Sequence, residues 1–220
     1  MERVNYKYMN IQDIINEIRT YEPNNLNFFL QALDDLKSKN KDLNTMLELG
    51  CEGGNYSALF NEKFNNQCKN IMVEPCIESW QKFGEKYFQD KKNIYFYNNY
   101  IGEIIWAHWG GQNDSKVIDL KSKVKKISFN EILSESNTDY IDILHMDMQG
   151  TEYFILKEFI ENNLIEKINY IFIMTHVFDN INYQSYLDLL FNSNLNDKIL
   201  FNDLSYAENG DGLIIIKNKN

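Results

Sequence analysis

Short apolar runs alternate with segments of helical periodicity along most of this chain, and this alternation limits the fold more than any other feature. Each short run has the length and composition of a buried strand, and each periodic segment has the spacing of an amphipathic helix. Such alternation is typical of βαβ units around a parallel sheet. The predicted strands are NTMLELG (44–50), NIMVEP (70–75), NIYFYNN (93–99), DYIDILHMD (139–147), INYIFIMTH (168–176), DKILFND (197–203) and GLIIIKN (212–218), and the predicted helices between them are 55–64, 76–88, 151–163 and 183–192.

The last two predicted strands are separated by a segment rich in turn formers, AENGDG. Asn-Gly and Asp-Gly favour tight turns between antiparallel strands. We therefore predict an α/β fold with a seven-stranded, mostly parallel sheet that ends in an antiparallel C-terminal hairpin.

Two further helices are predicted before the first strand, over 10–20 and 25–38, from apolar residues at helical spacing. No linker rich in proline, glycine or serine divides the chain. We predict one domain over 1–220, with a helical N-terminal extension over 1–40 and an α/β core over 44–220. The extension would either cap the functional cleft or form a homodimer interface, and the sequence does not choose between them.

The composition limits the classes of binding partner and the cellular compartment that we expect. A net charge of -10 disfavours binding to nucleic acid. No apolar stretch is long enough to span a membrane, and the N-terminus lacks the apolar region of a secretory signal. The three cysteines show no paired metal-binding pattern, so we expect reduced thiols in a cytoplasmic protein.

The stretch MLELGCEGG (46–54) places a glycine-rich turn directly after the first predicted strand. In α/β proteins this turn is where ligands bind, and glycine allows a ligand to approach the backbone closely. Gly50, Cys51, Gly53 and Gly54 would form this turn. Glu52 would place negative charge where a dinucleotide pyrophosphate binds, which disfavours a nicotinamide-dependent oxidoreductase. Together with Glu48 at the strand end, it favours a cationic ligand.

The second predicted strand also ends in a carboxylate, Glu74, followed by Pro75. In this topology an acid at that position accepts hydrogen bonds from ribose hydroxyls. The carboxylates at the two strand ends therefore predict that the ligand is a positively charged nucleoside without phosphates. S-adenosylmethionine, with its sulfonium and ammonium groups, fits that description.

Several motifs resemble those of the FkbM family of S-adenosylmethionine-dependent methyltransferases. The family's D-V-G-A-N-x-G-x-Y-S corresponds to ELGCEGGNYS (48–57), its E-P to VEP (73–75), and its I-D-x-L-K-I-D-V-E-G-x-E to IDILHMDMQGTE (141–152). A weaker match is NNYIGE (98–103). The resemblance extends over about 44–177 and implies a Rossmann-like class I methyltransferase fold and O-methylation, often of a sugar hydroxyl in glycans or natural products. We therefore predict an S-adenosylmethionine-dependent O-methyltransferase that acts on a sugar, either free, nucleotide-linked or within a glycan.

The resemblance also assigns roles to individual residues. Glu48, Gly50 and Gly54 would frame the methionine portion of the cofactor, Glu74 would hold the ribose, and the segment 98–101, which includes Asn99, would flank the adenine. Asp147 would lie beside the methyl donor and the acceptor. The chain departs from the family at His145, where the family has lysine, at Gln149, where it has glutamate, and at SFN (128–130), where it has T-L-D.

A hydroxyl acceptor requires a base or a metal ion to remove its proton. His145 lies two residues before Asp147 on one predicted strand, and His176 ends the next. Because the ends of neighbouring parallel strands meet, His145, Asp147 and His176 could form either a base or a divalent metal site. The segment WAHWGGQND (106–114) would form a loop over the cleft, with His108 or Trp109 in contact with the acceptor.

Two other functions stay open on this reading. A domain that binds S-adenosylmethionine or a partner without catalysis would fit the loss of charge at Gln149 and Asn130, and a nicotinamide-dependent oxidoreductase is disfavoured by Glu52. The acceptor, the need for a metal ion and the oligomeric state are not determined by the sequence.

Overall fold

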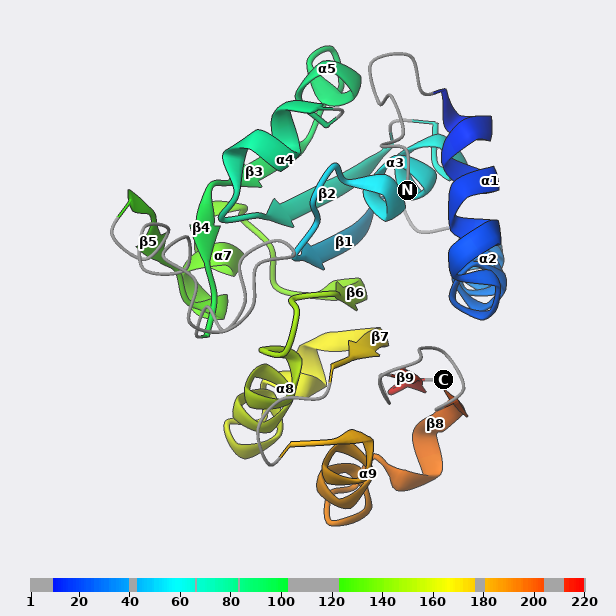
Figure 1. The fold of residues 1–220 in the computed structure, drawn as a ribbon, viewed down its shortest axis with the longest axis vertical. Coiled ribbons are helices and arrows are strands. Elements are labelled where there is room, and N and C mark those ends of the chain that lie inside the picture. Colours follow the sequence, from blue (N-terminus) through cyan, green and yellow to red (C-terminus); the bar gives the residue numbers. More distant parts are fainter. Residues whose placement is uncertain are drawn as a thin grey trace.

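A seven-stranded sheet lies between two layers of helices in the computed structural model, which describes residues 10–39, 43–65, 67–82, 84–102, 123–176, 181–203 and 212–219 (Figure 1). The strand order is β3-β2-β1-β6-β7-β9-β8. Neighbours from β3 to β7 run parallel, and β9 is antiparallel to both β7 and β8. The strands are β1 (Asn44–Leu49), β2 (Cys68–Val73), β3 (Ile94–Tyr97), β6 (Ile141–Met146), β7 (Ile168–Thr175), β8 (Ile199–Asp203) and β9 (Gly212–Lys217).

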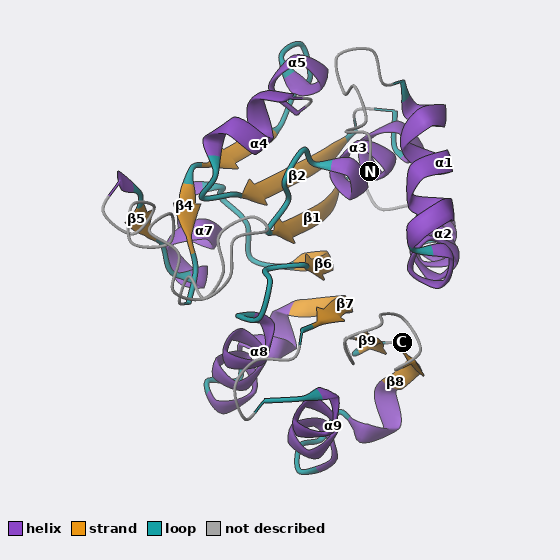
Figure 2. Ribbon diagram, in the orientation of Figure 1, coloured by secondary structure: helices purple, strands orange, loops and turns teal. Residues whose placement is uncertain are grey.

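The helices divide between the two faces of this sheet (Figure 2). The first face is covered by the N-terminal helices and by those that follow β1 and β2: α1 (Ile11–Tyr21), α2 (Pro23–Ser38), α3 (Asn55–Lys63), α4 (Ile77–Lys82) and α5 (Gly84–Phe88). The second face is covered by α7 (Phe129–Glu135), α8 (Glu152–Glu161) and α9 (Tyr183–Phe191). Short 3-10 turns, Leu164–Lys167 and Asn196–Lys198, lead into β7 and β8.

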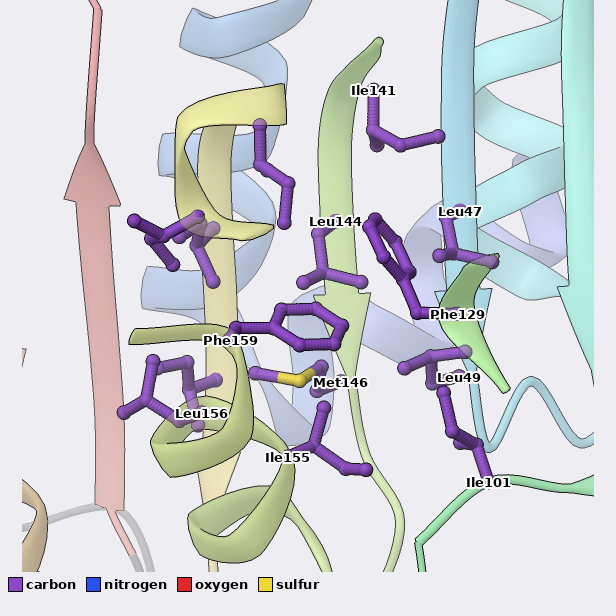
Figure 3. Packing of buried hydrophobic residues seen from close by; sticks show 14 of the residues in the cluster. Leu47, Leu49, Ile101, Phe129, Ile141, Leu144, Met146, Ile155, Leu156 and Phe159 are labelled. Atoms are coloured by element: carbon purple, nitrogen blue, oxygen red, sulfur yellow. The ribbon is translucent and has the colours of Figure 1, made fainter. Parts of the chain in front are cut away.

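The period-2 alternation of each strand builds a separate apolar core on each face. Leu47 and Leu49 of β1 join the core under α7 and α8, where Phe159 packs beside Leu144 and Met146 of β6 (Figure 3). The alternate residue, Met46, joins the core under α1, α2 and α3. Strands β1, β6 and β7 are buried along their whole length, as is typical of the central strands of a sheet that helices cover on both faces.

The N-terminal helices have clear local start signals. Asn10 caps α1 by accepting hydrogen bonds from the amides of Gln12 and Asp13, and Pro23 begins α2.

The hydroxyl of Tyr170 on β7 donates to Asp35 of α2 at 2.7 Å, and Lys217 of β9 lies 3.4 Å from the same carboxylate. The predicted extension is therefore attached to the sheet itself.

The predicted strands and helices are confirmed, including the antiparallel C-terminal pair, but three details differ. The predicted helix over 76–88 consists of two short helices, α4 and α5. Helix α7 was not predicted, and neither was a small second sheet made of β4 (Asn99–Tyr100) and β5 (Lys125–Lys126). The proposed acceptor loop at 106–114 and most of the AENGDG turn lie outside the described residues.

No helix within the described ranges is long and apolar enough to cross a membrane. The three cysteines are free thiols, as expected; Cys51 and Cys68 are buried and Cys76 is partly exposed.

Candidate active site

The glycine turn after β1 packs directly against the backbone that follows β6. Gly50 has a φ of +74°, and a Cβ atom there would lie 2.0 Å from the carbonyl oxygen of Asp147. The amide of Gly50 donates to Val73 O at 2.9 Å, and the amide of Asp147 donates to Leu49 O at 3.0 Å. Glycine is required here because any side chain would separate the ends of β1 and β6. The turn therefore brings Asp147 next to the predicted cofactor residues.

Glu48 is buried beneath the start of α3. Its Oε2 accepts a hydrogen bond from the amide of Ser57 at 3.0 Å, near the positive end of that helix. The pKa of Glu48 is raised to about 8. Burial is the main cause, the hydrogen bonds from Ser57 and the backbone oppose the rise, and the charge of Asp147 adds to it. Gly54 caps α3 in a left-handed conformation, with φ +77°. The carboxylate would gain from a neighbouring positive charge.

Glu74 closes the second strand with its carboxylate fixed by two backbone amides. Oε2 accepts from the amide of Glu52 at 2.9 Å, and Oε1 accepts from the amide of Cys76 at 2.8 Å. Burial is the main cause that raises the pKa of Glu74 to about 7. Each oxygen retains a second lone pair, so this fixed carboxylate can still accept hydrogen bonds from a diol.

The other predicted cofactor residues differ in how they lie relative to these two acids. Cys51 is buried, and burial raises the pKa of its thiol. Asn98 donates through Nδ2 to the carbonyls of Glu74 and Pro75, both at 3.0 Å, which fixes the segment after β3 against the end of β2. Asn99 instead donates to Lys125 O at 3.0 Å, in the small second sheet. Its side chain is thus engaged with β5, whereas Asn98 reaches the Glu74 strand end.

Asp147, His176 and Glu152 lie together at the ends of β6 and β7. Their ligand atoms all lie within 4.8 Å of one another. His176 Nδ1 is 2.9 Å from Glu152 Oε1, and His176 Nε2 is 3.6 Å from Asp147 Oδ1. The pKa of Asp147 is raised to about 7. Burial is the main cause, the charge of His176 opposes the rise, and the charges of Glu22 and Glu152 add to it.

A tight turn after β6 holds Glu152 in this position. Glu152 is fully buried at the start of α8, and its two oxygens accept from the amides of Met148 (2.5 Å) and Gly150 (2.9 Å). Gln149 has a left-handed φ of 55°, and its Nε2 lies 3.2 Å from both Asp147 Oδ1 and His176 Nε2. Because Glu152 Oε1 already accepts from the Met148 amide and from His176 Nδ1, this oxygen is suited to orient the His176 ring. A divalent ion would be held by Asp147 and His176, with Glu152 beside them as a further ligand.

His145 lies in a different environment from the one predicted. It is buried on β6, its ring stacks on Tyr56 with centroids 4.1 Å apart, and its Nε2 is 3.2 Å from Asn25 Nδ2. Burial lowers its pKa to about 3, so the ring is neutral at physiological pH. The structure therefore groups Asp147 and His176 with Glu152 and places His145 under α2.

Sequence reasoning gave no role to two acids that lie here, Glu152, which is part of the 141–152 motif, and Glu22. Glu152 had a visible signal, since it directly follows the turn after Asp147 and begins a helix. Glu22 had none, because it lies between two helices far from every motif. Its carboxylate is held by Tyr56 and Asn25, and its charge acts on Asp147 and His176.

Comparisons with known proteins bear on the fold. Neither a family sequence model nor a curated protein sequence matches the chain. The N-terminal domain of human METTL16, solved with S-adenosylhomocysteine, is similar at a TM-score of 0.50 and 10% identity, covering 96% of this chain and 84% of that one. A human methyltransferase 10 domain containing protein has a TM-score of 0.50 at 11% identity, covering 97% of this chain and 100% of that one.

A third similar structure is fibrillarin from Aeropyrum pernix, solved with natively bound S-adenosylmethionine. It has a TM-score of 0.47 at 12% identity, and the match covers 79% of this chain and 66% of that one. Together with the strand order, the first two structures show that the chain has the Rossmann-like fold of class I methyltransferases, as predicted.

Proposed function

We propose that this protein is an S-adenosylmethionine-dependent O-methyltransferase that acts on a sugar hydroxyl, either of a nucleotide-linked sugar or of a glycan. The class I methyltransferase fold supports methyl transfer, and the carboxylates at the ends of β1 and β2 support this cofactor. The motifs that resemble the FkbM family support a sugar as the acceptor.

The residues of the candidate site fit the cofactor in charge. The raised pKa values of Glu48 and Glu74 indicate that a nearby positive charge would stabilise both carboxylates, which suits a ligand with sulfonium and ammonium groups. Each oxygen of Glu74 keeps a lone pair that can accept from a ribose hydroxyl, and the Gly50 turn holds the end of β1 against Asp147. When bound, the cofactor supplies an electrophilic methyl group.

The pair formed by His176 and Glu152 is the observation that carries the proposal of a hydroxyl acceptor. Because Glu152 Oε1 accepts from His176 Nδ1, we assign the ring proton to Nδ1, and Nε2 then carries a lone pair, to which Gln149 Nε2 donates at 3.2 Å. That nitrogen faces Asp147 at the ends of β6 and β7. A buried carboxylate behind a histidine orients the ring and stabilises its protonated form, so Nε2 can take the proton of an acceptor hydroxyl.

The first experiment is a calorimetric titration of the purified protein with S-adenosylhomocysteine, with NAD as the comparison and with or without Mg²⁺ or Mn²⁺. We expect micromolar binding of S-adenosylhomocysteine alone. A folded protein that binds neither ligand, or only NAD, would contradict the proposal. An acceptor screen of nucleotide sugars then follows, with release of S-adenosylhomocysteine as the signal.

A substitution at Asp147 tests the proposed chemistry. We expect Asp147→Asn to reduce turnover by about 100-fold or more, since a charge next to the proton acceptor is lost, while the protein remains folded. The control is Glu161→Gln, an exposed acid at the end of α8. Unchanged turnover of the Asp147 variant would remove this residue from the proposed machinery.

A further inference from the structure

The junction between the two N-terminal helices places a carboxylate in the active site. Glu22 is the residue between α1 and α2. Its Oε2 accepts from the hydroxyl of Tyr56, the second residue of α3, and from Asn25 Nδ2 at 3.0 Å. Tyr56 lies two residues after Gly54, the last glycine of the turn. The N-terminal helix pair is thus joined to the segment that frames the predicted cofactor site.

Asn25 extends this connection to the strands that lead to Asp147 and His176. Its Nδ2 lies 3.2 Å from His145 Nε2 on β6 and 3.2 Å from Met174 Sδ on β7. These residues stand two positions before Asp147 and His176 respectively, so the junction lies over the carboxyl-terminal half of both strands. Electrostatics agree with the geometry: burial raises the pKa of Glu22 and His176 opposes that rise, whereas burial raises the pKa of Asp147 and the charge of Glu22 adds to the rise.

One half of the Glu22 carboxylate is left for a ligand. Oε2 already accepts two hydrogen bonds, whereas Oε1 has no partner among the described residues. If Glu22 served only to fasten the helix pair, a neutral amide oxygen would suffice and would avoid a third charge beside Asp147 and Glu152. A half-buried carboxylate near other acids is stabilised when a positive group binds next to it.

We propose that Glu22 binds the primary ammonium group of a ligand in the active site, and that the N-terminal helix pair is therefore a wall of that site. This inference rests on the proposed function, because a methyltransferase of this kind has two sources of such a group: the amino-acid end of the cofactor, or an acceptor that is an amino sugar. The shared chemistry is an ammonium group that donates to Glu22 Oε1.

The cofactor source is tested by titrating the full-length protein with two ligands. S-adenosylhomocysteine carries the ammonium group, and 5′-methylthioadenosine lacks the whole amino-acid end. If the cofactor is the source, Glu22→Gln should weaken S-adenosylhomocysteine binding about tenfold, the value of one charge-assisted hydrogen bond, and leave 5′-methylthioadenosine binding unchanged. Glu85→Gln, an exposed acid on α5, is the matched control and should change neither.

The acceptor source is tested by titrating the protein saturated with S-adenosylhomocysteine. Glucosamine and glucose serve as probes, because they differ in whether C2 carries an ammonium or a hydroxyl group. If the acceptor is the source, the wild type should bind glucosamine better than glucose. Glu22→Gln should abolish that preference, while its affinity for S-adenosylhomocysteine stays at the wild-type value.

Two results would overturn the inference while leaving the proposed function in place. The first is that the wild type and Glu22→Gln bind S-adenosylhomocysteine with the same affinity and also show the same relative affinity for glucosamine and glucose. The second is that Glu22→Gln loses affinity equally for S-adenosylhomocysteine and 5′-methylthioadenosine and has a lower melting temperature, and that Tyr56→Phe shows the same losses. Glu22 would then have only a structural role, in holding the helix pair in place. A folded wild type that does not bind S-adenosylhomocysteine would remove the proposed function and this inference together.

Discussion

The buried carboxylate of Glu152 allows a sharp test of how the active-site turn is held. Its two oxygens accept from three donors: the amides of Met148 and Gly150, and Nδ1 of His176. Glu152→Gln keeps the size of the side chain but replaces one oxygen with an NH₂ group. At least one buried donor then faces another donor, and the charge that strengthens the remaining bonds is lost.

The expected loss is about 2–3 kcal/mol of unfolding free energy, since hydrogen bonds to charged groups contribute about 1.5–3 kcal/mol each and one acceptor oxygen remains. For a chain of this length the melting temperature should fall by about 4–12 °C. The measurement is urea denaturation followed by circular dichroism, with the melting temperature as a second readout.

The control for this test is on the same helix. Glu161→Gln removes an exposed acid that lies 3.8 Å from Lys157, and we expect a change below about 0.5 kcal/mol. If Glu152→Gln were as stable as Glu161→Gln, the hydrogen bonds to Glu152 would not be holding the turn, and its role in orienting His176 would be refuted.

Three further results are expected. Gly50→Ala should lose at least about 2 kcal/mol of unfolding free energy, because φ is +74° and the new Cβ would meet Asp147 O; a variant as stable as wild type would show that the two loops are not in contact. Glu48 has a folded pKa of about 8 against an ordinary value of 4.5, so its stabilising contribution is complete below about pH 4.5 and is lost as pH rises through 8. The melting temperature of Glu48→Gln should therefore rise relative to wild type from pH 5 to 8, and a constant difference would contradict this. With an acceptor in hand, His176→Asn should reduce turnover by about 100-fold, whereas His145→Phe should leave the pH–rate profile unchanged, because the His145 ring is already neutral.

Much of the fold can be predicted from the sequence because the signals are local. Each strand is a short apolar run bounded by polar residues, and the turn after β1 is marked by glycines that a close approach requires. Helix α7 also had a readable signal, since Ser128 and Glu131 form a capping box in the sequence S-F-N-E. The two-residue strands β4 and β5 had no such signal, because a pair of that length is set by its neighbours rather than by its own composition.

The candidate site divides in the same way. The sequence by itself determined that Glu48, Glu74 and Asp147 end neighbouring strands, and the parallel sheet then brings them to one edge. Only the tertiary structure decided which histidine joins them: period-2 alternation puts His145 and Asp147 on the same side of β6, but helix α2 covers that side and buries His145 against Tyr56. It also decided that Glu152 lies behind His176, and that Glu22 reaches the site from outside the sheet. These contacts join residues far apart in the chain, and no periodicity or spacing within one segment encodes the packing of a helix pair onto a strand end.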